Sequence, residues 1–115
     1  MLAPGSLLKQ LSPSAATATT AVTATAGLQT KITTILICNT TSEAIKYRIY
    51  HDEAGITYAI SNALYYDVTL AANSTETISF FPGSGISLAG ADSLGVESNT
   101  ANVVFSVYGV TQQGR

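Results

Sequence analysis

The sequence is short of charged residues. Asp, Glu, Lys and Arg make up 10% of its 115 residues, and the net charge is −2, whereas an average soluble domain carries about 25% charged residues. Disordered chains combine low hydrophobicity with high charge, so 46% apolar residues and a mean hydropathy of +0.28 predict a chain that folds as one domain. A Thr-rich surface with so little charge favours an oligomer. The alternative is a monomer with an uncharged polar coat.

Basic residues are too few and too dispersed for a nucleic-acid site. Only two of the five lie close together, and the sequence pI is about 5.0. Binding to phosphates requires a cluster or stripe of positive charge, so we expect no nucleic-acid partner. The five are Lys9, Lys31, Lys46, Arg48 and Arg115.

Cysteine and long apolar runs are also scarce. Cys38 is the single cysteine, which excludes an internal disulfide, and its place in an apolar run predicts a small buried side chain. No run approaches the roughly 18 apolar residues of a membrane span. We therefore expect no membrane partner.

The residues that support catalysis are nearly absent. The one acid–base cluster is His51-Asp52-Glu53, and neighbouring residues on a strand point to opposite faces, so these three side chains cannot converge on one atom. A metal site needs at least three converging ligands, and the chain has one His and one Cys. No Gly-x-Ser-x-Gly motif is present. The sequence predicts a protein that is not an enzyme and that has no metal, no cofactor and no catalytic residues.

What the sequence does contain is a series of short apolar and alternating segments. Turn signals separate about eight segments of strand character at intervals of roughly 8–12 residues, and none has a sustained helical period. This pattern is typical of an all-β antiparallel β-sandwich or jelly-roll-like fold. The expected strands cover residues 31–39, 44–51, 56–60, 66–70, 75–81, 86–88, 92–97 and 102–110, with one turn of helix possible at residues 61–64.

The two ends of the chain differ from the middle. We expect residues 1–26 to form an extended N-terminal arm and a weak edge strand, residues 27–110 to form the sandwich, and residues 111–115 to be a loose polar tail. Four leucines in the first eleven residues would allow the arm to dock onto a neighbouring subunit, or to fold back on its own core. Prolines flank the last three of them, and their spacing would allow one helical turn. They are Leu2, Leu7, Leu8 and Leu11.

Six tyrosines are the other notable group. Tyrosine is common in β-sheets, in protein interfaces and on sugar-binding surfaces, so sheet packing, a subunit interface and a carbohydrate platform all remain open. Together with the leucines, four tyrosines are the candidate assembly residues: Tyr47, Tyr65, Tyr66 and Tyr108.

Three segments of the sequence resemble a widespread family of small virion proteins of tailed bacteriophages. They are I-T-T-I-L-I-C-N-T at residues 32–40, L-Y-Y-D-V-T-L-A-A-N-S-T at 64–75 and A-G-A-D-S-L-G-V-E-S at 89–98. The similarity covers most of residues 15–110. Many relatives begin the first strand with a Tyr-Thr-Val-Pro-Ala-Gly-like turn, and residues 22–27 lack its proline.

The resemblance implies a compact β-sandwich located in the virion, after assembly in the host cytoplasm. Members of this kind act as capsid decoration (cement) proteins or as parts of tails, baseplates and fibres. The implied partners are copies of the chain itself, with a homotrimer preferred because it fits local three-fold positions on a shell, and the major capsid protein or another virion protein. A carbohydrate-binding module is the alternative from another class.

Overall fold

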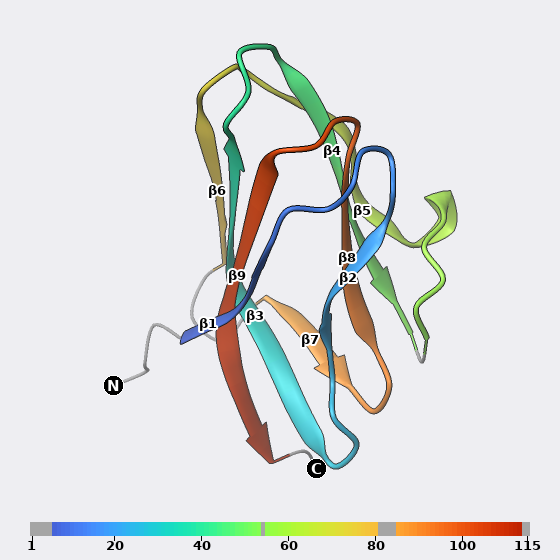
Figure 1. Ribbon diagram of the computed structural model, residues 1–115. Coiled ribbons are helices and arrows are strands. Elements are labelled where there is room, and N and C mark those ends of the chain that lie inside the picture. Colours follow the sequence, from blue (N-terminus) through green and yellow to red (C-terminus); the bar gives the residue numbers. More distant parts are fainter. Residues whose placement is uncertain (1–5, 54, 81–84, 114–115) are drawn as a thin grey trace.

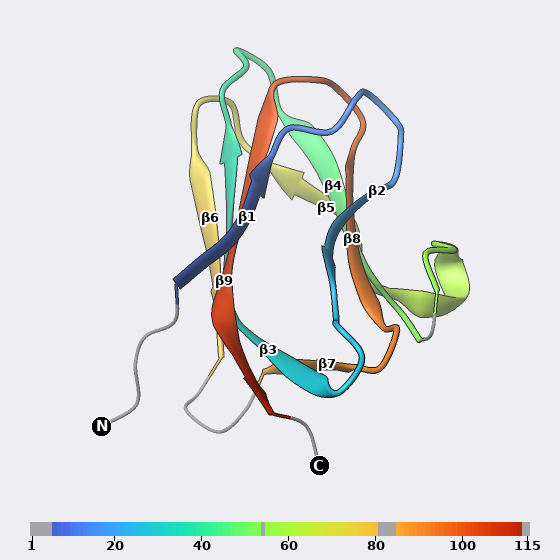
Figure 2. The same ribbon diagram turned by 60° about the horizontal axis from the view of Figure 1, so that its bottom comes forward.

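The protein is a β-sandwich of two antiparallel sheets. The computed structural model describes residues 6–53, 55–80 and 85–113, and in these residues nine strands are found. They are β1 (Ser6–Leu11), β2 (Thr19–Thr23), β3 (Leu28–Asn39), β4 (Ile45–Asp52), β5 (Ala63–Leu70), β6 (Thr75–Ser79), β7 (Ile86–Ala89), β8 (Ser93–Ser98) and β9 (Val103–Gln113). Figures 1 and 2 show the sheets face to face. The predicted fold class is confirmed.

Sheet A has the strand order β1-β9-β3-β6. The long strand β3 pairs with β9 along one edge, whereas its other edge is shared by β7, at Gln29–Ile32, and β6, at Thr34–Cys38. Sheet B has the order β2-β8-β4-β5. Strands β2 and β5 therefore lie at the two edges of sheet B.

The core lies between the sheets and follows the alternation of each strand. Side chains at every second position point inward, and on β4 these are Ile45, Tyr47 and Ile49, which are buried. The ring of Tyr47 packs edge-on against Phe105 of the opposite sheet, with centroids 6.3 Å apart. The other fully buried large side chains are Ile32, Ile35, Ile37, Leu88, Leu94, Val96, Val103 and Val107.

One buried amide holds the loops at one end of the sandwich. Asn39 is 1% exposed. Its side-chain nitrogen donates to the carbonyls of Glu43, at 2.8 Å, and Ala71, at 3.0 Å, while its oxygen accepts the backbone N–H of Thr41. Such a bond to a nearby backbone N–H is why Asn initiates turns, so the predicted turn after β3 is present.

The described part of the predicted N-terminal arm belongs to the sandwich. Residues 6–11 are not a helical turn but strand β1, paired with β9 of the same chain, and β2 is an edge strand of sheet B. Residues 6–26 therefore fold back on their own domain, which is one of the two alternatives that the sequence left open.

Three local predictions differ from the structure. Residues 56–59 are a loop and not a strand, and Ile60 belongs to a single turn of 3-10 helix, η1 (Ile60–Asn62), which begins one residue earlier than expected. Residues 111–113 are not a loose tail, because β9 continues through them and pairs with Leu28–Thr30. Polar composition suggested a loose end, but main-chain pairing does not depend on side-chain polarity.

Candidate assembly surfaces

The four leucines of the N-terminal segment have different environments. Leu2 lies outside the described residues. Leu7 is 48% exposed, whereas Leu8 and Leu11 are partly buried against the core of their own chain. Of the three described leucines, Leu7 is the most exposed to a contact with another molecule.

The four candidate tyrosines lie in three different places: the core, the outer side of β5 and the outer side of β9. Tyr47 is buried, and Tyr65 packs against the same core. Tyr66 is 41% exposed on β5, and Tyr108 lies on β9 in the other sheet. The structure therefore does not bring these rings together, and they do not form a shared platform for a sugar.

Two of the candidate assembly residues, Leu7 and Tyr108, lie on the outer surface of sheet A. Leu7 and Tyr108 are opposite each other in the β1–β9 ladder, and directly opposed residues share a face. Leu36, Cys38 and Val104 point to this outer side as well, since their neighbours in each strand are buried in the core. Cys38 is half-buried on this surface, so the prediction of a core side chain was wrong.

A more exposed apolar region lies on the loop between β4 and β5 and on the edge strand β5 of sheet B. It consists of four side chains from one continuous stretch of chain, the loop between β4 and β5 and the first half of β5. We call it the β5 patch, and its members are Ile56 (66% exposed), Ile60 (74%), Leu64 (44%) and Tyr66 (41%). Of these four residues the sequence identified only Tyr66, because residues 56–60 were expected to form a strand.

The loop that carries the isoleucines is fastened to the outer face of sheet B by Tyr58. Its ring packs beside that of Tyr50, with centroids 5.6 Å apart. Its hydroxyl shares hydrogen bonds with the hydroxyls of Thr20, at 2.7 Å, and Ser93, at 2.9 Å. This ring also explains why Tyr50, on the outer side of β4, is only 3% exposed.

Asp52 and Asn62 hold the two ends of the same loop. The carboxylate of Asp52 accepts the backbone N–H of Thr57 at 2.8 Å. The amide of Asn62 donates to the carbonyl of Thr57 at 2.7 Å, and its oxygen accepts the N–H of Ala59 at 2.9 Å. The loop beside β5 in Figure 1 is therefore internally braced on both sides of Tyr58.

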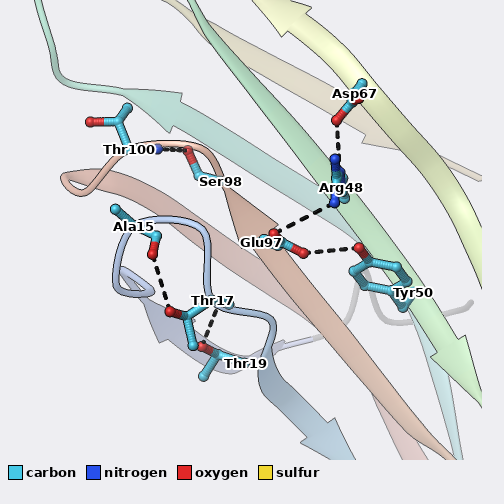
Figure 3. A network of polar contacts seen from close by, with 9 residues as sticks. All are labelled: Ala15, Thr17, Thr19, Arg48, Tyr50, Asp67, Glu97, Ser98 and Thr100. Carbon is cyan, nitrogen blue, oxygen red and sulfur yellow. Dashed lines mark hydrogen bonds and ion pairs between the residues drawn. The ribbon is translucent and has the colours of Figure 1, made fainter. Parts of the chain in front are cut away.

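Charged side chains beside the β5 patch are paired with each other (Figure 3). Nε of Arg48 donates to Asp67 at 2.7 Å, and its guanidinium lies 3.6 Å from Glu97, which accepts the Tyr50 hydroxyl at 2.9 Å. The hydrogen bond from Arg48 lowers the pKa of Asp67, and the same bond raises that of Arg48. The guanidinium also lies 4.1 Å from the ring centroid of Tyr66.

This network lines a shallow hollow of about 200 Å³ together with Lys46, Ser98 and Asn99. Ligand pockets are usually about 300–1,000 Å³ and largely apolar. The hollow is smaller, and its Arg48, Asp67 and Glu97 side chains already satisfy one another. It is better described as the surface of an ion-pair network than as a ligand site.

The single histidine has an acidic neighbour that the sequence did not identify. Nε2 of His51 lies 3.6 Å from Oδ2 of Asp92, 41 residues away in the sequence. Asp92 also accepts the backbone N–H of Ala89 in the β7–β8 turn, so the pair places that turn against β4. Asp52 instead braces the β4–β5 loop. His51 and Asp52 therefore contact different groups.

Two other searches of the described ranges gave no site. In residues 6–53, 55–80 and 85–113, no group of three His, Cys, Asp or Glu side chains is placed to hold a metal ion. Over the same ranges, no helix has the length and apolar character that a bilayer crossing requires.

Comparison with known proteins gives a likeness in fold. No family model matches the sequence, and no curated protein matches it. Among solved structures, a chain of infectious bursal disease virus (IBDV), Gx strain, superposes with a TM-score of 0.53 and 17% identity over 98% of this chain. A chain from the crystal structure of an IBDV viral particle superposes with a TM-score of 0.52 and 15% identity over 92% of this chain. This chain spans about a third of their length, 32% and 29% respectively. At these identities the likeness concerns the β-sandwich fold.

Proposed function

We propose that this chain is a non-enzymatic structural protein of a virion. In this proposal it is a capsid decoration (cement) protein that stabilises the shell as a homotrimer, in contact with the major capsid protein. The observation that carries the proposal is the combination of exposed apolar side chains on a braced surface with charged groups that are paired among themselves. Such a surface suits contact between proteins.

Two further observations support this proposal. The fold is similar, over nearly the whole chain, to part of chains from particles of an icosahedral virus. The sequence resembles small virion proteins of tailed bacteriophages in three segments. A cyclic trimer is a closed assembly that matches a local three-fold position, and many identical copies on one shell turn weak contacts into strong attachment.

The second candidate is a tail, baseplate or fibre module of the same virion. The β5 patch and the outer surface of sheet A would serve there equally well, because both expose apolar side chains. The position of the chain in the particle distinguishes this candidate from the first.

The experiment compares virions that carry the chain with virions from which its coding sequence has been deleted. We expect purified wild-type particles to contain the chain, and deletion to lower the temperature at which the shells release their genome. Addition of the purified protein to the deletion particles should restore that temperature. Absence of the chain from purified particles would refute the virion proposal, and its presence in tails with unchanged shell stability would select the second candidate.

A further inference from the structure

The β5 patch combines high exposure with a fixed shape. Its side chains are 41–74% exposed. Among the described residues, Leu7 is the one other large apolar side chain with comparable exposure, at 48%. Exposure of Ile56 and Ile60 does not come from a loose loop, because Tyr58, Asp52 and Asn62 fasten the segment between them. Side chains held in place before binding lose little conformational entropy when a partner arrives.

Irregular pairing in β5 determines what kind of contact the edge can make. In the β4–β5 ladder, Tyr47 pairs with Val68, Ile49 with Tyr65 and Tyr50 with Ala63. β5 therefore carries one extra residue between Tyr65 and Val68 and another at Leu64. Such bulges redirect side chains and twist a sheet edge out of the flat form that strand addition needs. The edge favours contact through the side chains of Leu64 and Tyr66 over addition of an extended peptide.

The distribution of charged residues around the β5 patch indicates which partner it binds. Residues 55–66 contain no Asp, Glu, Lys or Arg. Of the charged groups that touch this stretch, Asp52 accepts the backbone N–H of Thr57, and Arg48, which lies against Tyr66, is paired with Asp67. A different protein would usually be selected by complementary charges, and this stretch provides none. Around a rotation axis each residue near the axis meets its own copies, so like charges there would repel. A charge-free, apolar patch suits self-contact, since homo-oligomer interfaces are the more apolar class.

We propose that the β5 patch is the contact between copies of this chain, placed around a rotation axis of the oligomer. This inference rests on the proposed function for its biological role, and it names the surface that the homotrimer would use. Ile56 and Ile60 from the braced loop and Leu64 and Tyr66 from β5 would bury their exposed surface against the same patch of the neighbouring copies.

The test measures the mass of the purified full chain by light scattering and sedimentation over a range of concentrations. The double variant Ile56→Ser/Ile60→Ser changes side chains that touch solvent and should therefore fold. Its matched control is Leu7→Ser, an equally apolar change at an exposed site of the other sheet. Circular dichroism and thermal unfolding check that both variants are folded.

We expect the wild type to be an oligomer, the double variant to dissociate at a concentration at least tenfold higher, and Leu7→Ser to match the wild type. A wild type that stays at 11.9 kDa at every concentration, or variants that weaken association equally or not at all, would overturn the inference. Those results would not affect the particle experiment, which tests the proposed function separately. If the chain is absent from virions but the double variant dissociates as expected, the proposed function is refuted and the β5 patch remains the self-contact.

Discussion

The ring of Tyr58 lies directly on the backbone of Gly95. A Cβ atom added at Gly95 would be 2.6 Å from both Cε1 and Cζ of that ring, closer than packed carbon atoms allow. Gly95 is therefore required in β8 because a side chain from the β4–β5 loop occupies the space above it. Together with the hydrogen bonds of Tyr58, Asp52 and Asn62, this contact holds the loop that carries Ile56 and Ile60.

We predict that Gly95→Ala releases the loop without unfolding the sandwich. The new methyl group displaces the Tyr58 ring, with a cost of about 1–3 kcal/mol in the free energy of unfolding, as is typical for overpacking. Limited proteolysis should cut the variant within residues 53–62 faster than the wild type, and self-association should weaken.

A double-mutant cycle with Tyr58→Ala tests the cause. Once the ring is absent, Gly95→Ala should cost little or nothing. A cost that is the same in both backgrounds would show that Tyr58 is not the residue that excludes a side chain at position 95.

A second prediction concerns the link between the two sheets. The hydroxyl of Tyr47, on β4, donates to Glu76, on β6, at 2.9 Å. Tyr47→Phe removes this bond and should cost about 1.5–3 kcal/mol, the range for hydrogen bonds to charged groups. Urea unfolding at pH 7 measures the loss.

The same pair predicts a dependence on alkaline pH. Burial, and then the bond to Glu76, raise the pKa of Tyr47, so the folded state keeps this proton when the unfolded chain begins to lose it, near pH 10. The stability advantage of the wild type over Tyr47→Phe should be fully present below pH 10 and shrink above it. An advantage that stays constant to pH 11 would contradict the assignment.

A third prediction concerns acid. The bond from Arg48 lowers the pKa of Asp67, so Asp67 contributes stability above the pKa of the unfolded carboxyl, near 4, and loses it as the pH falls through the lower folded pKa. Asp67→Asn suits the test because Asn tolerates the positive φ of 53° at this position. Its deficit relative to the wild type should be small at pH 7 and should disappear towards pH 3.

The control for the acid experiment is Glu43→Gln, on an exposed acidic side chain of the β3–β4 loop. Urea midpoints of this variant should follow those of the wild type at both pH values. If the deficit of Asp67→Asn is unchanged at pH 3, the ion pair with Arg48 does not contribute to stability.

Strand alternation was the part of the fold that the sequence could predict. Ile45, Tyr47 and Ile49 share the inner face of β4 because successive side chains on a strand point to opposite sides. The same rule failed at residues 56–60. There Ile56 and Ile60 alternate with polar or small residues, but Tyr58 finds its partners, Thr20 and Ser93, more than 30 residues away in sequence. Local pattern cannot reveal such long-range partners.

The candidate assembly residues were chosen because they are leucines and tyrosines. Residue type alone does not determine whether a side chain on a strand points to the core or to solvent. Leu8 and Leu11 pack on the core of their own chain, while Leu7 is exposed, because a bulge between Leu7 and Lys9 shifts the register of β1. Tyr65 and Tyr66 are neighbours in sequence and lie on opposite sides of β5. Leu64 is exposed because it is an extra residue at a bulge in the β4–β5 ladder. No pattern in the sequence predicts this bulge.

The central claim is that this sandwich is a building block of a virus particle, and a cryo-EM map of virions that contain the chain tests it most directly. We predict density for three copies at local three-fold positions on the outside of the shell, with Ile56, Ile60 and Tyr66 of each copy facing the shared axis. A complete map of shell and tail in which no density fits the sandwich would contradict the claim.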